Sequence, residues 1–232
     1  ALGIFCTRIL KTLFTTRGNS SAIAQQVYFV VVRSLPTVII AGIFVGAILI
    51  VQYNLTLSAY NAQHLLGGLN TSGLVREVGP LIISFLLAGK IGAYTAAELG
   101  TMRVTEQIDA IECLGTNPMQ YLIVPRYVGI IISSVILLAL GLVIAIAGSM
   151  VVARVIAGIN FLEFTTSIPR FNSGLTVVWG ALKCVIYSAI VAGVACHRGY
   201  TASGGARGVG KAVTLAAVYT NFYIVIANFI TS

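Results

Sequence analysis

Long runs of apolar residues, separated by short polar stretches, dominate this sequence of 232 residues. A helix needs about 20 mostly apolar residues to cross the hydrocarbon core of a membrane, which is roughly 30 Å thick. Five runs reach that length and none alternates with period two, so helices are predicted rather than strands of a membrane barrel. The predicted spans cover residues 36–57, 75–97, 127–153, 174–196 and 212–231. The pattern therefore predicts an all-α polytopic membrane protein that forms a single domain.

The first 20 residues have an amphipathic rather than a continuously apolar pattern. Apolar residues recur at helical spacing, with cations set among them. These are Leu2, Phe5, Ile9 and Leu13, together with Arg8, Lys11 and Arg17. Such a pattern is typical of a helix that lies on a membrane surface with its cations toward anionic headgroups. The stretch lacks the continuous apolar core of a signal peptide, and the missing initiator Met leads us to expect that the natural chain begins further upstream.

Hydrophobic residues make up 58% of the chain and charged residues only 9%, whereas soluble domains carry about a quarter charged residues. This composition excludes a soluble enzyme, a disulfide scaffold and a disordered chain. Of the 14 basic residues, nine fall on the side predicted to be cytoplasmic and three on the opposite side. Since cytoplasmic loops are enriched in Lys and Arg, the N-terminus is predicted to be cytoplasmic and, after five spans, the C-terminus to be periplasmic. Membrane topology thus explains the net charge of +8, and no nucleic-acid partner is expected.

One stretch is similar to a phosphate-binding loop, because Gly205 to Lys211 matches GxxxxGK. It is followed by Ala212, however, where such a loop needs Ser or Thr to bind Mg²⁺, and no buried strand precedes it. We therefore interpret this stretch as a cytoplasmic loop and expect no ATP site in this chain. The sequence has no HExxH or GxSxG motif, and its four cysteines are scattered without the spacing of a metal site. The chain is predicted to hold no catalytic residue, no metal and no cofactor of its own.

The polar segment between the second and third predicted spans contains four of the six acidic residues. Within it, residues 99–115 are predicted to form a short amphipathic helix parallel to the membrane. One face carries Val104, Ile108 and Ile111, and the opposite face carries Arg103, Glu106 and Asp109. The polar face is either a solvated surface or a docking site for a protein. Docking is favoured, because acidic residues that face an anionic membrane surface are unfavourable.

A second polar feature is the adjacent pair Arg76 and Glu77 at the outer end of the second span. The two opposite charges either pair with each other at the interface or contact a charged headgroup near the mouth of a cavity. The C-terminal half of the first span mixes apolar, polar and aromatic side chains, a composition suited to lining such a cavity. Both interpretations of the pair remain open at this point.

Two lysines lie inside predicted spans, Lys90 in the second and Lys183 in the fourth. Each is expected either to extend its ammonium group to the interface or to pair with a carboxylate. Lys183 lies deeper in its span and is expected to face protein or water. In the first span, Gly42 and Gly46 form a pair of small residues, four apart, that allows close contact with another helix.

Several longer stretches resemble the MlaE (YrbE) family of permeases. They are residues 74–80 (LVREVGP), 87–92 (LAGKIG) and 97–109 (AELGTMRVTEQID), followed by Pro118 and by Pro125-Arg126. The predicted order of a surface helix, five spans and a helical loop after the second span also fits this family. The similarity extends over essentially the whole chain.

The resemblance implies the permease subunit of an ABC transporter that moves phospholipid or a related lipid between the bacterial inner membrane and an MCE protein. A separate ATPase subunit (MlaF-like) would bind ATP and Mg²⁺, a ring of MCE-domain proteins (MlaD-like) would lie on the outer side, and the permease would pair with a second copy of itself. The helical loop would be the coupling helix, with ATPase contacts at Glu98, Arg103, Glu106, Gln107 and Asp109. A lipid pocket between the paired copies would be lined by Leu49, Thr56, Leu57, Tyr60, Arg76 and Glu77.

Two other functions compete with lipid transport. A non-transporting membrane scaffold would anchor an MCE and ATPase complex without moving lipid. An ATP-independent channel would need a continuous polar seam along several spans, and the third and fifth spans are too uniformly apolar for one. One residue departs from the family: Thr56 stands where members tend to have an aliphatic residue, which predicts a more polar wall on that side of the pocket.

Overall fold

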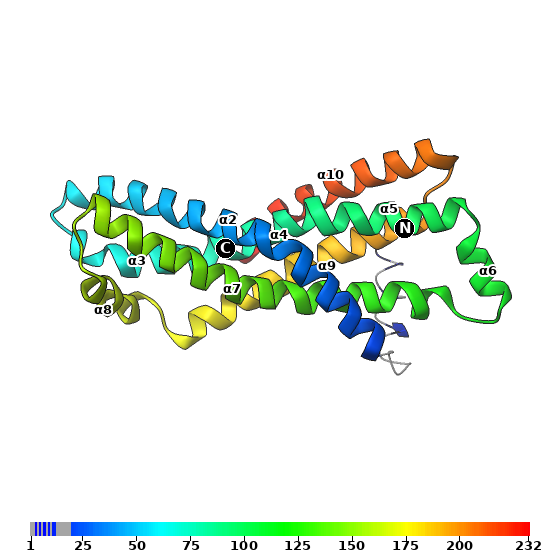
Figure 1. Cartoon of the computed structure of the whole chain (residues 1–232), viewed down its shortest axis with the longest axis horizontal. Helices are drawn as coiled ribbons and strands as arrows, with labels where there is room; N and C mark the ends of the chain where they lie inside the picture. The colour runs from blue at the N-terminus through cyan, green and yellow to red at the C-terminus, as the bar shows by residue number, and fades with distance from the viewer. Residues whose placement is uncertain (1–2, 4, 6, 8, 10, 13–19) are drawn as a thin grey trace. The chain divides into compact units, whose positions relative to one another are not determined.

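The computed structural model describes residues 3, 5, 7, 9, 11 and 12 and the continuous stretch 20–232, and every element in this part of the chain is helical (Figure 1). Three of the short elements are π-helical turns (η2, η3 and η4), and η1 is a 3₁₀ helix. In chain order, the elements are α2 (Ser20–Ser58), η1 (Gln63–Leu65), α3 (Leu66–Gly73), η2 (Leu74–Val78), α4 (Gly79–Leu87), η3 (Ala88–Gly92), α5 (Ala93–Val104), α6 (Gln107–Cys113), η4 (Met119–Ile123), α7 (Val124–Ile156), α8 (Phe161–Phe171), α9 (Gly174–Tyr200) and α10 (Gly205–Thr231). The all-α prediction is confirmed.

Within the described residues, four helices are long and apolar enough to cross a membrane. They are Ser20–Ser58, Met119–Ile156, Gly174–Tyr200 and Gly205–Thr231. These helices contain the first, third, fourth and fifth predicted spans, so the prediction of a multi-pass membrane protein is confirmed. The second predicted span, residues 75–97, is helical throughout but is divided among η2, α4, η3 and the start of α5. The count of five spans therefore stays a prediction.

The charged residues of the second predicted span all lie in its π-helical turns. Arg76 and Glu77 belong to η2, and Lys90 belongs to η3. A π turn interrupts the regular ladder of helical hydrogen bonds and is frequently found at functional sites. It also rotates the following residues around the helix axis, so the direction of these charged side chains departs from that in a regular helix.

One compact unit of the chain comprises Ala1–Ser34, Ser84–Ser134 and Val185–Ser232. Its apolar core contains Phe5, Ile9, Leu99, Ile108, Leu122, Ile123 and Cys196. Phe5 and Ile9, expected on the lipid-facing side of a surface helix, are buried in this core, and the Phe5 ring packs edge-on against His197 with centroids 5.1 Å apart. The predicted partners Leu2, Arg8, Leu13 and Arg17 lie outside the described residues.

The connection between α9 and α10 is only four residues long, 201–204. Gly204 and Gly205 have φ angles of +91° and +66°, which glycine adopts without the steric cost of a side chain. The interpretation of the GxxxxGK-like stretch as a loop is therefore wrong, because Gly205 to Lys211 form the first turns of α10. The positive φ angles of Gly204 and Gly205 allow a connection of only four residues between α9 and α10, and residues 205–211 are helical.

The second compact unit comprises Leu35–Ile83 and Val135–Cys184. Its apolar core contains Ile50, Leu66, Ala153, Ile159 and Phe164. The small residues of α2 pack on α7: Gly46 lies against the backbone carbonyl of Ala145, and a Cβ at this position would lie 2.6 Å from Ser149 Oγ. As the spacing of small residues predicts, Gly46 permits close contact between two helices.

Helix α8 was not predicted from the sequence. It packs on α3, with Phe164 buried in the core of the second unit and Asn172, just after the helix, donating a hydrogen bond to the carbonyl oxygen of Gly68 (3.3 Å). Gly67 lies against the Phe164 carbonyl, where any side chain would collide. The connection between the third and fourth predicted spans is thus a packed helix.

Candidate functional site

The predicted coupling segment, residues 99–115, is two helices and not one. Helix α5 ends at Val104, and α6 begins at Gln107. Between them Glu106 has a φ of +60°, a left-handed conformation that is uncommon for a residue with a side chain. The hydroxyl of Thr105 donates to the carbonyl oxygen of Thr101 (2.8 Å) and so satisfies a carbonyl group at the end of α5. The chain therefore changes direction at Thr105–Glu106.

Helix α6 is held to its unit by one fully buried side chain, Ile108, which belongs to the apolar core. Glu106 and Gln107 are exposed, and so are Glu112 and Cys113. At the C-terminal end Leu114 is 83% exposed. An exposed segment with acidic and amide side chains, ending in an exposed leucine, is a surface suited to binding another protein.

Two of the predicted coupling residues pair with each other across the bend. The guanidinium of Arg103 in α5 forms an ion pair with the carboxylate of Asp109 in α6. The Arg103 guanidinium also lies 5.9 Å from the centre of the Tyr200 ring. The ion pair braces α6 against α5, whereas the Tyr200 contact joins α5 to α9, so Arg103 and Asp109 contribute to the position of α6 as well as to its surface charge.

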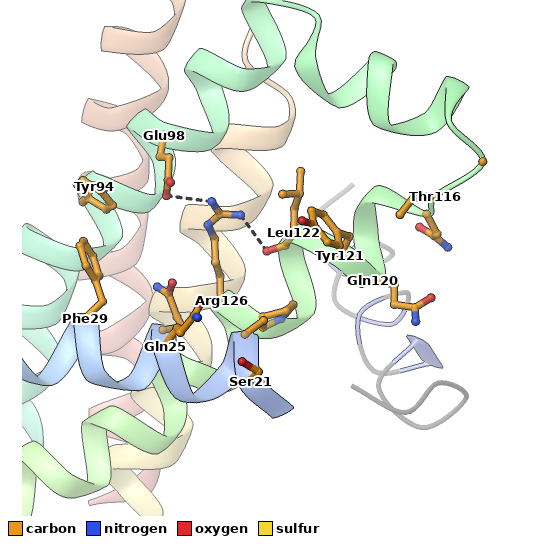
Figure 2. Close-up of a pocket in the computed structure, with 15 residues that line it drawn as sticks. Ser21, Gln25, Phe29, Tyr94, Glu98, Thr116, Gln120, Tyr121, Leu122 and Arg126 are labelled. Carbon is orange, nitrogen blue, oxygen red and sulfur yellow. Dashed lines mark hydrogen bonds and ion pairs between the residues drawn. The ribbon is translucent and has the colours of Figure 1, made fainter. Parts of the chain in front are cut away.

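Glu98, the remaining predicted coupling residue, lies in α5 and lines a pocket of about 1010 Å³ (Figure 2). There its carboxylate forms an ion pair with the Arg126 guanidinium, with Nη2 and Oε2 3.0 Å apart. Arg126 also donates a hydrogen bond to the carbonyl oxygen of Leu122 (3.0 Å). The rest of the lining is rich in amide and aromatic side chains: Gln25, Gln26, Phe29, Tyr94, Asn117, Gln120 and Tyr121. A neighbouring pocket of about 630 Å³ shares Tyr94, Glu98 and Arg126 and includes Gln107.

In the second unit, Glu77 has a partner far away in the sequence, which neither interpretation of the Arg76 and Glu77 pair included. The Glu77 carboxylate forms an ion pair with the ammonium group of Lys183 in α9, with Nζ and Oε1 2.6 Å apart. The Lys183 side chain is only 11% exposed, whereas that of Glu77 is 38% exposed. Lys183 therefore pairs with a carboxylate, one of its two predicted outcomes, and a buried charge is neutralised as its position in the span requires. Arg76 is exposed beside this pair.

The other predicted lipid contacts lie on the C-terminal part of α2 and just beyond it, in the same unit. Leu49 and Leu57 are half-buried, Thr56 is exposed and Tyr60 is 78% exposed. This part of α2 lies close to Gly73, the last residue of α3, and is hydrogen-bonded to η1. A Cβ at Gly73 would lie 2.8 Å from the Tyr53 hydroxyl, and the Gln63 amide donates to Asn54 (3.1 Å). The structure thus gathers the predicted lipid contacts in one unit.

The predicted coupling residues do not share one helical face. Arg103, Glu106, Gln107 and Asp109 lie around the α5–α6 bend, and Glu98 lies earlier in α5, where it lines a pocket together with Gln107. Neither the pairing of Arg126 with Glu98 nor that of Lys183 with Glu77 was predicted from the sequence. A cation at the start of the third span was visible in the Pro125-Arg126 motif, but its partner lies 28 positions earlier in the chain. In the described part of the chain no group of three His, Cys, Asp or Glu residues is placed to hold a metal ion, and Cys113, Cys184 and Cys196 form no disulfide bond.

Comparison with known proteins gives a consistent set of relatives. A family model described as Permease MlaE matches residues 23–232. A probable ABC transporter permease protein of Rickettsia prowazekii is 34% identical over 210 residues, which cover 90% of this chain and 81% of the relative. Another protein of that description, from Synechocystis sp., is 33% identical over 242 residues, covering 100% of this chain and 92% of the relative. Protein TRIGALACTOSYLDIACYLGLYCEROL 1, chloroplastic, of Arabidopsis thaliana is 31% identical over 225 residues, covering 97% of this chain and 63% of the relative.

Proposed function

We propose that this chain, which belongs to the MlaE permease family, moves a phospholipid or related lipid between the bacterial inner membrane and an MCE-domain protein. The chain is a membrane permease subunit of an ABC transporter. The observation that carries the proposal is the family match over residues 23–232, which includes almost all of the four long apolar helices of the described chain and both polar regions described above. The name of the Arabidopsis relative, which contains that of a glycolipid, supports a lipid as cargo.

In this proposal a separate ATPase subunit binds ATP and Mg²⁺ and docks on α6. The exposed side chains of Glu106 and Gln107, followed by the exposed Leu114, support this docking surface. Arg103 and Asp109 position α6 through their ion pair. When ATP closes two ATPase subunits on each other, the movement reaches the membrane helices through α6. Such a cycle requires that nucleotide binds the two conformations of the complex with unequal affinity.

The lipid-binding residues in this proposal are Leu49, Thr56, Leu57, Tyr60, Arg76 and Glu77. A second copy of the permease would cover the exposed side chains among them and complete a pocket between the two copies. Arg76, exposed beside the Glu77–Lys183 pair, would contact the lipid headgroup. The pocket would open toward a ring of MCE-domain proteins on the outer side of the membrane, with the permease N-terminus cytoplasmic and its C-terminus periplasmic.

The test is lipid transfer by the complete complex of permease, ATPase and MCE protein, reconstituted in proteoliposomes. A fluorescent phospholipid should leave or enter the permease membrane with ATP and not with a non-hydrolysable ATP analogue. Hydrolysis of ATP without any lipid transfer would make the complex a non-transporting scaffold and overturn the proposal.

Arg76→Ala tests the headgroup contact in the same complex. A photoreactive phospholipid should crosslink to this variant several-fold less than to the parent protein. Arg170→Ala is the matched control, because Arg170 is an exposed arginine of the same unit in α8 and outside the proposed pocket. Equal crosslinking of the Arg76→Ala variant and the parent would remove Arg76 from the pocket.

A further inference from the structure

Helix α8 has no role in the proposed function, although it carries large apolar side chains on two of its sides. On the packed side, where α8 lies beside α3, Phe164 and Ser167 are buried (Figure 1). On another side Phe161 is 52% exposed and Leu162 is 75% exposed. Exposed apolar side chains that lie together on a helix mark a surface that binds an apolar partner.

The exposed surface of α8 is divided between an uncharged strip and a charged edge. Glu163 and Arg170 are seven positions apart and, with about 3.6 residues per helical turn, lie along one edge. The uncharged strip, the free face of α8, lies between this edge and the packed side. It consists of Phe161, Leu162, Thr165, Thr166 and Pro169, all of them exposed. A helix with an apolar face and a charged edge is typical of the interface of a membrane.

Both ends of α8 are tied to helices that are long and apolar enough to cross a membrane. At the start, the guanidinium of Arg154, near the end of α7, donates a hydrogen bond to the side-chain oxygen of Asn160, the residue before α8. At the end, only residues 172–173 connect α8 to α9, and such a connection reaches about 11 Å at most. A helix of 11 residues is about 16 Å long, which exceeds that reach. We therefore expect α8 to run along the membrane surface rather than to project from it.

The exposed apolar surface of the two neighbouring membrane helices extends up to α8. On α7, exposed apolar residues recur at helical spacing to the last turn; they are Leu140, Val143, Val151 and Val155. On α9 they begin in the first turn, with Leu175, Val178 and Leu182. Exposed apolar stripes on membrane-crossing helices are the surfaces that contact lipid. The free face of α8 is thus flanked along the chain by lipid-contacting surface at both ends.

We propose that α8 lies in the lipid interface of the leaflet at the outer ends of α7 and α9, and that its free face binds phospholipid acyl chains. Phe161 and Leu162 enter the acyl-chain region, while Glu163 and Arg170 stay at the level of the headgroups. The absence of charge on the free face suits this partner, because the acyl chains offer no group to pair with a charge. Helix α3, on which α8 packs, continues directly into η2, so α8 would also fix the level of Arg76 in the membrane.

This contact with the bilayer goes beyond the proposed transport of lipid. It requires only that the chain is embedded in a membrane, and it would exist equally in a non-transporting scaffold. A failure of the transport experiment would leave it standing, and its own failure would leave transport standing.

The test is tryptophan fluorescence of the full permease chain reconstituted in phosphatidylcholine liposomes. The chain has one tryptophan, the exposed Trp179, so Trp179→Phe provides a background without tryptophan. The apolar face of an interfacial helix lies about 5–10 Å below the boundary between headgroups and acyl chains. In the Trp179→Phe background, Leu162→Trp should therefore emit at short wavelength, and lipids brominated on the upper part of the acyl chains should quench it several-fold more than aqueous iodide. Phe161→Trp, an exchange of one aromatic residue for another, is a second probe of the same face.

The matched control is Glu163→Trp, which places the probe at the adjacent exposed position on the charged edge. It should emit at longer wavelength than Leu162→Trp, with weaker quenching by the brominated lipids and stronger quenching by iodide. Emission of Leu162→Trp at long wavelength with quenching by iodide alone would place the free face in water and overturn the proposal. Emission at short wavelength that neither quencher reduces would show that protein, such as a second copy of the chain, covers the face, and would also overturn it.

Discussion

Replacing Glu77 with Gln should destabilise the protein more than replacing its partner Lys183 with Met. Breaking a fully buried ion pair by removing one partner costs about 3–5 kcal/mol, because the other charge stays buried and unpaired. Lys183 is only 11% exposed, so Glu77→Gln leaves a buried ammonium group. Because the Glu77 side chain is 38% exposed and water reaches the pair, we expect a smaller loss, about 2 kcal/mol. Lys183→Met leaves a carboxylate that water can solvate, and it should cost less than about 1 kcal/mol.

The double variant separates the ion pair from the two side chains. Glu77→Gln with Lys183→Met has no unpaired buried charge and should recover most of the stability lost in Glu77→Gln alone. The free energy of unfolding can be measured by denaturant titration of the purified permease in detergent micelles for the parent, the two single variants and the double variant. A larger loss for Lys183→Met than for Glu77→Gln, or losses that simply add in the double variant, would refute an interaction between these two charges.

Three further predictions concern packing and the α5–α6 bend. Gly46→Leu should destabilise the permease by about 2 kcal/mol or more, measured by the same titration, because its side chain would collide with the Ala145 carbonyl; unchanged stability would contradict the close packing of α2 on α7. Glu106→Lys with Gln107→Lys should leave the thermal unfolding of the permease unchanged, since both residues are exposed, but should reduce lipid-stimulated ATP hydrolysis at least tenfold if α6 docks the ATPase; normal stimulation would remove α6 from that interface. In a variant whose other cysteines are Ala, Cys113 should react rapidly with a maleimide in the free permease and several-fold more slowly in the complex with the ATPase; equal rates would place the partner elsewhere.

The sequence predicted the membrane helices well because their signal is local. A run of apolar residues long enough to cross the bilayer needs no information about distant residues, and four of the five predicted runs lie in long helices. The second span is different, because its residues alternate between α-helical and π-helical hydrogen bonding. Gly, Pro and charged residues in 75–97 show that the span is unusual, but where a helix widens depends on what packs against it.

The candidate sites were predictable in composition but not in pairing. Lys183 and Glu77 are 106 positions apart, and nothing in the sequence distinguishes pairing from extension of the lysine to the interface. The bend at Glu106 was missed for a related reason. A residue with a side chain rarely adopts positive φ, so a pattern of apolar and polar positions predicts an unbroken helix through it. Tertiary anchoring of Ile108 in the core favours the bent path instead.

Helix α6 has the mechanical form of a short lever with a joint at each end. The chain has a positive φ angle on each side of α6, at Glu106 and at Gly115, and the buried side chain of Ile108 is the point at which α6 is anchored. The core that surrounds Ile108 contains side chains from α5, η4 and α9 together with Phe5 and Ile9, so a load applied to α6 reaches these three helical segments and the two N-terminal residues at the same point. A displacement of α6 would thus move the ends of these segments together rather than one after another. Stiffness at Ile108, more than charge on the surface of α6, would then determine how much of a partner's movement reaches the membrane.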